Sequence, residues 1–290
     1  MKLFRCVLFL IASLLVISLQ ECFSGNGAQA QSAVVTTSGD RALAEKILHN
    51  LENGPTGKMM IFAAREMLGT PYVAGSLDGG DIEELRVYLT RTDCMIFVET
   101  CLNLARAVKT FGNDADFDRF ASMIRQTRYR DGRISDYSDR LHYTTEWIRQ
   151  GEEEGILEDI TLSLGGKSYD HKISYMSSHP DAYPHVNSSN LPMIKQAEDR
   201  LNREEMTCIP SDKIHAVEGG IQDGDIVCFV SKIEGLDISH MCLAYRYEGK
   251  LRFIHASTKA GKVVIDNMSI AEYALSRPKS VAGIKVVRPK

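Results

Sequence analysis

One cysteine at the start of a predicted helix offers the clearest chemistry in this sequence. From Cys94 onward, apolar residues recur with the 3.6-residue period of a buried helix face. Thr92 or Asp93 can cap that helix by accepting a hydrogen bond from the free N–H groups of its first turn. A cysteine in a first turn lies near the positive end of the helix dipole, which favours thiolate over thiol. We therefore interpret Cys94 as a candidate nucleophile with a lowered thiol pKa; the alternative is an inert core cysteine.

Two histidines lie on a predicted β-hairpin. Glu248-Gly249 has the composition of a two-residue turn between two apolar segments, residues 239–247 and 250–257. An antiparallel register about this turn makes His240 and His255 diagonal neighbours on one face, with about 7 Å between their backbones. Their side chains would then be in reach of each other.

These three residues could act as a nucleophile, a base and a group that orients the base. His240 would take the proton of the Cys94 thiol, and His255 would hold the far nitrogen of the His240 ring. The backbone N–H of Cys94, free at the helix start, would help to hold an oxyanion. Each histidine alone could be structural, and a Cys/His/His cluster could bind zinc. The capped helix start favours thiolate chemistry, and we expect neither a metal nor another cofactor.

The composition is that of an exported globular protein. The chain has 290 residues with 25% charged and 44% hydrophobic residues, and its net charge of -4 gives no support to nucleic-acid binding. A basic start, an apolar run at residues 6–19 and Ala28-Gln29-Ala30 predict a secretory signal peptide over residues 1–30. We expect a periplasmic or secreted protein that has no membrane segment after cleavage. Cys22 follows Glu21, which makes a poor lipoprotein signal.

Five cysteines remain after removal of the signal peptide. An odd number leaves at least one unpaired in an exported protein, and five are too few for a disulfide scaffold. The sequence has no CxxC pair, so a structural zinc site lacks support. The five are Cys94, Cys101, Cys208, Cys228 and Cys242.

Helical patterns precede strand patterns along the chain, which predicts an α+β fold. We expect helices at residues 40–50, 58–68, 94–109, 117–128, 141–151 and 191–205. We expect strands at residues 84–89, 226–230, 239–247, 250–257, 262–265 and 282–287. Residues 112–215 carry a mixed signal without linker composition, so they are interpreted as a mostly helical insertion in a single domain of residues 31–290.

Five short segments resemble the NlpC-type, papain-like cysteine hydrolases of bacterial cell walls, and they occur in that family's order. They are Gly69-Thr70-Pro71-Tyr72-Val73-Ala74-Gly75, Thr92-Asp93-Cys94, Asp223-Gly224-Asp225-Ile226-Val227, Ser239-His240-Met241 and Phe253-Ile254-His255-Ala256-Ser257. The resemblance implies a papain-like core, in which the Cys94 helix packs on an antiparallel sheet. It also implies Cys94 as nucleophile, His240 as base and His255 as third member.

The same resemblance suggests which residues meet the substrate. Tyr72 would line the site beside Cys94, and Asp93 and Ser239 would flank the catalytic residues. The long insertion is similar to that of an N-acetylmuramoyl-L-alanine amidase-like branch. From that similarity we expect the insertion residues Arg130, His142 and Tyr143 to contact sugar or peptide; paired or solvated structural roles are the alternative.

Two departures bear on specificity. The family has a small serine after the cysteine and Trp-Gly-Gly after the tyrosine, whereas this chain has Met95 and Ala74-Gly75-Ser76. The serine helps endopeptidase members to hold the free amine of the stem peptide, so its loss puts that activity in doubt.

The resemblance therefore predicts cleavage of the amide between N-acetylmuramic acid and L-alanine through an acyl-enzyme on Cys94. The alternatives are a γ-D-glutamyl D,L-endopeptidase, a catalytically inactive wall-binding module and a thiol acyltransferase. The expected partners are peptidoglycan fragments, and the expected state is a monomer.

Overall fold

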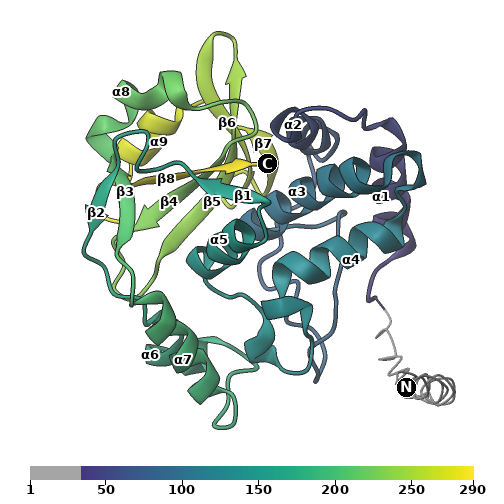
Figure 1. The fold of residues 1–290 in the computed structure, drawn as a ribbon, viewed down its shortest axis with the longest axis horizontal. Helices are drawn as coiled ribbons and strands as arrows, with labels where there is room; N and C mark the ends of the chain where they lie inside the picture. Colours follow the sequence, from purple (N-terminus) through teal and green to yellow (C-terminus); the bar gives the residue numbers. More distant parts are fainter. Residues whose placement is uncertain (1–33) are drawn as a thin grey trace, which may run out of the picture. The chain divides into compact units, whose positions relative to one another are not determined.

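Helix α3 (Cys94–Phe111) lies between the other N-terminal helices and the sheet (Figure 1). In this computed structural model, which describes residues 34–290, α3 contacts α1 (Ser38–Asn50), α2 (Thr56–Glu66) and α4 (Phe117–Arg128). It also contacts two strands, so it is buried nearly all round, as a helix with neighbours on both sides must be. The predicted helix at residues 94–109 is confirmed, whereas the predicted signal peptide at residues 1–30 lies outside the described residues.

The strands of residues 34–290 form one antiparallel sheet. Its order is β2-β3-β8-β4-β5-β6-β7, and β1 pairs with β8 off this path. The strands are β1 (Leu157–Asp159), β2 (Lys167–Tyr169), β3 (Met206–Pro210), β4 (Ile226–Ser231), β5 (Ile238–Tyr247), β6 (Lys250–Ser257), β7 (Lys262–Ile265) and β8 (Val281–Pro289). Together with the helices, this sheet confirms the α+β prediction.

The two faces of the sheet are covered by different helices. Side chains alternate along a strand, so β4 sends Cys228 and Val230 into the core shared with α1–α4. It sends Val227 and Phe229 to the opposite face, under α9 (Ile270–Leu275). Figure 1 shows α9 and the N-terminal helices on opposite sides of the strands.

The hairpin that carries the two histidines has the predicted turn. Glu248 and Gly249 have φ values of 50° and 76°, as a type I′ turn requires at both central positions. The register runs from Tyr247↔Lys250 to Leu243↔Ile254, which confirms the pairing predicted about this turn.

Residues 112–215 are less uniformly helical than predicted. They contain α4, α5 (Thr144–Glu153), α6 (Tyr175–Ser178) and α7 (Leu191–Leu201), followed by α8 (Ile214–Val217). They also contribute β1, β2 and β3 to the main sheet, through pairing with β8 and with each other. Since β1 and β2 are three residues each, they are too short for a period-two pattern to reveal them.

The predicted strand at residues 84–89 is wrong. That segment makes only an isolated bridge between Val35 and Arg86, and the Asp40 carboxylate accepts the N–H groups of Leu89 and Thr90 at 2.8 Å each. Its alternating apolar residues are buried, but a helix-capping carboxylate takes the place of a neighbouring strand. Within residues 34–290, no helix combines the length and apolar character needed to cross a membrane.

Candidate active site

Cys94 is the first residue of α3, and the residue as a whole is half-buried. Asp93 caps the helix by accepting the N–H of Ile96 at 2.8 Å, so one of the two predicted caps is confirmed. Backbone N–H groups of Met241, Met95 and Cys94 itself favour the thiolate. Met241 directly follows His240 on β5. The contact of its N–H with the thiol therefore shows that this part of β5 lies beside Cys94.

Burial has a larger effect on the thiol pKa than these N–H donors. It raises the pKa of the Cys94 thiol to about 12, and the charge of Asp93 acts in the same direction. The predicted lowering of this pKa is therefore wrong for the protein in this conformation. The helix start supplies the expected N–H groups, but the enclosed position of the sulfur disfavours its charged form more strongly.

His240 and His255 are in direct contact. His240 Nε2 lies 2.7 Å from His255 Nδ1, which confirms the side-chain contact predicted from the hairpin register. On its other side, His255 Nε2 lies 3.2 Å from Asp266 Oδ2. The three side chains form a row from β5 through β6 to the residue after β7, and it leaves His240 Nδ1 as the ring nitrogen not used within the row.

Two aromatic rings pack against His240. Its ring is stacked on both Phe229 and Tyr273, with centroid distances of 6.0 Å and 5.9 Å, and these two rings also contact each other at 4.6 Å. Burial lowers the pKa of His240 to about 3, and the neighbouring His255 and Arg277 act in the same direction. Burial also lowers the pKa of His255 to about 4, although the Asp266 carboxylate opposes it. Both rings are therefore neutral near neutral pH, and His240 can accept a proton.

Tyr72 is beside the cysteine, as predicted. It forms a bridge with Thr92, and the Val73 N–H bonds the Thr92 carbonyl at 2.8 Å. Burial raises the pKa of Tyr72 to about 12, and the charges of Cys94 and Asp93 contribute. These contacts hold the Tyr72 segment against the start of α3.

Ser239 lies next to His240 on β5 and is itself exposed. Its hydroxyl donates to the Phe229 carbonyl at 3.2 Å, across an irregular step in the β4–β5 register. Contact of Ser239, Asp93 or Tyr72 with substrate stays a prediction.

Three predicted substrate residues have partners inside the protein. Arg130 pairs with Glu146 at 2.7 Å, and His142 Nε2 lies 2.8 Å from the Tyr137 carbonyl. The third residue, Tyr143, is buried and donates to Glu198 at 2.8 Å. These contacts match the structural alternative considered from the sequence, and contact of the three with substrate stays a prediction.

Arg140 has a position that the sequence patterns did not reveal. It pairs with Asp78 at 2.7 Å and Glu83 at 2.8 Å, and it donates to the Leu77 carbonyl at 3.1 Å. The insertion thereby holds the loop that follows Tyr72. The partners are about sixty positions away in sequence, so no local signal identifies them.

Asp266 could have been found from the sequence. In the β6–β7 register His255 faces Val264, so Asp266 is its diagonal neighbour two residues further on. This is the geometry that predicted the contact between His240 and His255. Applied to the next hairpin, it places a carboxylate beside His255.

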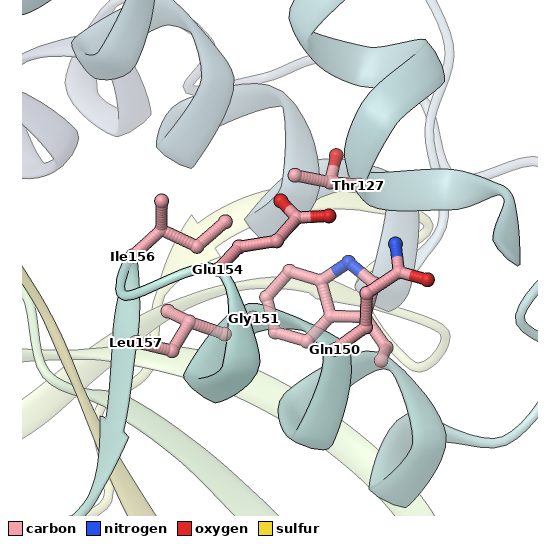
Figure 2. A pocket seen from close by; sticks show the side chains of 7 residues that line it. Thr127, Gln150, Gly151, Glu154, Ile156 and Leu157 are labelled. Carbon is pink, nitrogen blue, oxygen red and sulfur yellow. The ribbon is translucent and has the colours of Figure 1, made fainter. Parts of the chain in front are cut away.

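Two other features bear on the choice of site. A narrow crevice without room for a water molecule lies between α4, α5 and β1, where the Glu154 carboxylate extends between Ile156 and Thr127 (Figure 2). None of the candidate residues above lines it. Across residues 34–290, no group of three or more His, Cys, Asp or Glu side chains has an arrangement that could hold a metal ion.

Comparison with known proteins places this chain in a family. A family described as AmiA-like, N-acetylmuramoyl-L-alanine amidase-like, matches residues 62–284. A structure from Bacteroides uniformis ATCC 8492, named an N-acetylmuramoyl-L-alanine amidase and solved at 1.07 Å resolution, is 33% identical. Its TM-score is 0.74, and the match covers 81% of this chain and 99% of that one.

Two further structures are similar. A Bacteroides fragilis protein provisionally named a xylanase is 35% identical with a TM-score of 0.72, covering 78% of this chain and 98% of its own. A Legionella pneumophila protein, 22% identical with a TM-score of 0.66, covers 86% of this chain and 94% of its own and shares the fold. None of the curated proteins matches. Because the family match spans most of the sequence, this chain belongs to the AmiA-like, N-acetylmuramoyl-L-alanine amidase-like family.

Proposed function

We propose that this protein is a cysteine amidase with a papain-like core, which hydrolyses the amide between N-acetylmuramic acid and L-alanine. The observation that carries the proposal is the contact of His240 with His255 at 2.7 Å, beside the residue whose N–H faces Cys94. This arrangement has a thiol at a helix start, a neutral imidazole and a group that orients the imidazole. Family membership supports the choice of peptidoglycan as the substrate.

The resting thiol and imidazole are both neutral in this mechanism. Burial raises the pKa of Cys94 and lowers that of His240, so an ion pair would lie uphill before substrate binds. His240 Nδ1 takes the thiol proton as the sulfur attacks the carbonyl carbon of the muramic lactyl group. The backbone N–H of Cys94 helps to hold the oxyanion.

The remaining steps return the enzyme to its starting state. The tetrahedral intermediate collapses, the C–N bond breaks, and the protonated His240 gives its proton to the leaving L-alanine amine. A water molecule then attacks the thioester while His240 accepts one of its protons. Breaking the C–S bond releases the muramic carboxylic acid and restores the Cys94 thiol.

Mass spectrometry of digested muropeptides tests the proposal. An amidase releases intact stem peptides that begin with L-alanine, and it leaves sugars with a free lactyl carboxylate. Products that end in L-Ala-γ-D-Glu would instead identify the D,L-endopeptidase, and an acceptor other than water in the product would identify an acyltransferase. Xylan serves as a control substrate because one similar structure carries that provisional name.

The variant Cys94→Ala separates catalysis from binding. We expect it to lose amide hydrolysis while it keeps its fold, because alanine fits the space of the thiol. Full activity in this variant would overturn the mechanism, and wall binding without any hydrolysis by the unmodified protein would favour a binding module. We further propose that the protein acts as an exported monomer in the periplasm or outside the cell. Fractionation and light scattering test these two points.

A further inference from the structure

Asp266 lies beside the orienting histidine and is fixed in place by its own backbone. Asp266 Oδ2 lies 3.2 Å from His255 Nε2, and Asp266 Oδ1 accepts the Met268 N–H at 2.8 Å. The main chain of Asp266 is held separately, because its N–H bonds the Phe253 carbonyl at 2.9 Å. The two carboxylate oxygens therefore have different and defined partners.

The His255 nitrogen that faces Asp266 is enclosed. His255 is 2% exposed, and its Nε2 makes no regular hydrogen bond to any described residue. The 3.2 Å contact with Asp266 lacks the geometry of a regular hydrogen bond. A carboxylate can only accept, so it favours the form of His255 that carries its proton on Nε2.

The position of that proton determines the form of the next ring. If Nε2 of His255 carries the proton, its Nδ1 is a lone pair and must accept from His240 Nε2 across the 2.7 Å contact. His240 then carries its proton on Nε2, and its Nδ1 is left as a lone pair. That is the form in which His240 can take a proton from Cys94.

We propose that Asp266 is a positioning residue that fixes the tautomers of His255 and His240, so that His240 Nδ1 is the basic nitrogen. The inference rests on the proposed function, because it assigns the use of His240 as a base. Asp266 does not touch the substrate. It acts through two imidazole rings in series.

The Met268 N–H makes the Asp266→Asn change informative. An amide side chain has one acceptor oxygen, and the Met268 N–H requires that oxygen at the Oδ1 position. The amide NH₂ must then face His255 Nε2 and donate to it. His255 would carry its proton on Nδ1 and donate to His240 Nε2, and His240 would carry its proton on Nδ1, where it cannot accept from the thiol.

The order of three variants tests the proposal. We expect kcat for muropeptide hydrolysis to fall by about 100-fold or more in Asp266→Asn, the loss that follows from removing a general base. In serine proteases, the corresponding change of the orienting aspartate lowers kcat by about 10⁴-fold through the wrong tautomer. Asp266→Ala leaves the tautomer undetermined and should lose less, about tenfold, while KM stays unchanged. Asp266→Glu keeps a carboxylate and should regain part of the activity.

A structural role for Asp266 predicts the opposite order. Asparagine has the shape of aspartate and keeps the bond to the Met268 N–H, so it would be the milder change if the residue only supported the loop. An Asn variant that is as active as, or more active than, the Ala variant overturns the proposal. Asp116→Asn is the matched control, because Asp116 likewise accepts a backbone N–H at 2.8 Å, from Arg119 at the start of α4. It should leave kcat unchanged.

Nitrogen NMR of the histidine rings gives a readout that needs no activity. In the Cys94→Ala protein, His240 should carry its proton on Nε2, and adding Asp266→Asn should move that proton to Nδ1. If the tautomer changes but Cys94→Ala alone retains full hydrolysis, the proposed function fails while the positioning effect holds. If the tautomer does not change, the inference about Asp266 fails and the amidase proposal is untouched.

Discussion

His240 and His255 share one short contact, 2.7 Å between Nε2 and Nδ1, although fifteen positions separate them in the sequence. At this distance one nitrogen must donate and the other must accept, so each ring's tautomer depends on the other. Aromatic side chains also pack against both rings, and His255 is buried while His240 is half-buried, which disfavours added charge. The contact therefore fixes both the orientation and the neutral state of the candidate base.

The first prediction concerns replacement of His255. His255→Ala should lower kcat by roughly 10–100-fold while the protein remains folded, because the His240 ring loses its partner and can take unproductive orientations. His255→Asn or His255→Gln should restore part of the loss, since an amide can still hydrogen-bond the ring. Steady-state kinetics with circular dichroism as the folding control measures this. Equal activity in all three variants would contradict an orienting role.

The second prediction concerns the reactivity of Cys94 with iodoacetamide. Since burial raises the pKa of this thiol to about 12, the labelling rate should keep rising with pH beyond the ordinary cysteine pKa of about 8.5. Mass spectrometry of the Cys94 peptide follows the reaction. The other four cysteines of residues 34–290 are buried and serve as internal references. A plateau already reached below pH 7 would reveal a thiolate–imidazolium pair in the resting enzyme and contradict the neutral-pair mechanism.

The third prediction concerns stability in acid. Burial lowers the pKa of His142 to about 3, compared with about 6.5 in an unfolded chain. Between these values the unfolded chain binds more protons, so the contribution of His142 to stability is complete above about pH 6.5 and is lost as the pH falls toward 3. His240 and His255 act with the same sign.

Comparison with a variant isolates this effect from other titrating groups. Burial raises the pKa of Asp237, whose contribution has the opposite sign, so the wild-type curve alone mixes the two. His142→Asn should show a smaller drop in Tm between pH 7 and pH 4 than the wild type. Calorimetry at several pH values provides the measurement, and identical slopes for the two proteins would refute the assignment.

The fourth prediction concerns a buried ion pair that ties α4 to α3. Arg128 donates to Glu99 through Nε at 2.9 Å and through a second nitrogen, and the two side chains are 5% and 2% exposed. Arg128→Leu leaves the Glu99 carboxylate buried without its partner, so it should lower the free energy of unfolding by about 3–5 kcal/mol.

An exposed ion pair gives the matched control for this change. Lys46 and Glu66 lie 2.7 Å apart with 61% and 31% of their side chains exposed. Lys46→Leu should cost less than about 1 kcal/mol. Urea unfolding of both variants compares them, and similar losses would mean that burial of the Arg128 pair has no special weight.

Turn and helix-cap patterns predicted those parts of the site whose geometry depends on residues adjacent in sequence. The Glu248-Gly249 turn fixes the register of β5 on β6, and that register brings His240 to His255. The capped helix start at Cys94 follows in the same way from Asp93. Such features depend on a few adjacent residues with well-defined geometry.

Sequence patterns did not predict which groups are buried or which distant residues are in contact. The thiol pKa was predicted in the wrong direction, because a helix start is visible in the sequence while the enclosure of the sulfur depends on the whole fold. The strand predicted at residues 84–89 failed because Asp40 supplies the backbone partner. The internal partners of Arg130 and Tyr143 likewise come from other elements.

The last prediction concerns Arg140 and the loop that follows Tyr72. Arg140 contacts Leu77, Asp78 and Glu83 together, through a planar group that presents several donors at fixed angles. Arg140→Lys keeps the charge but cannot reproduce these contacts, so the loop should open more often. Hydrogen exchange should become faster in residues 75–83, and KM should rise more than kcat falls if the loop helps to hold the substrate. Arg119→Lys, at an exposed pair 3.9 Å from Asp116, is the control and should change neither. Unchanged exchange in the Arg140 variant would show that the loop is held without this side chain.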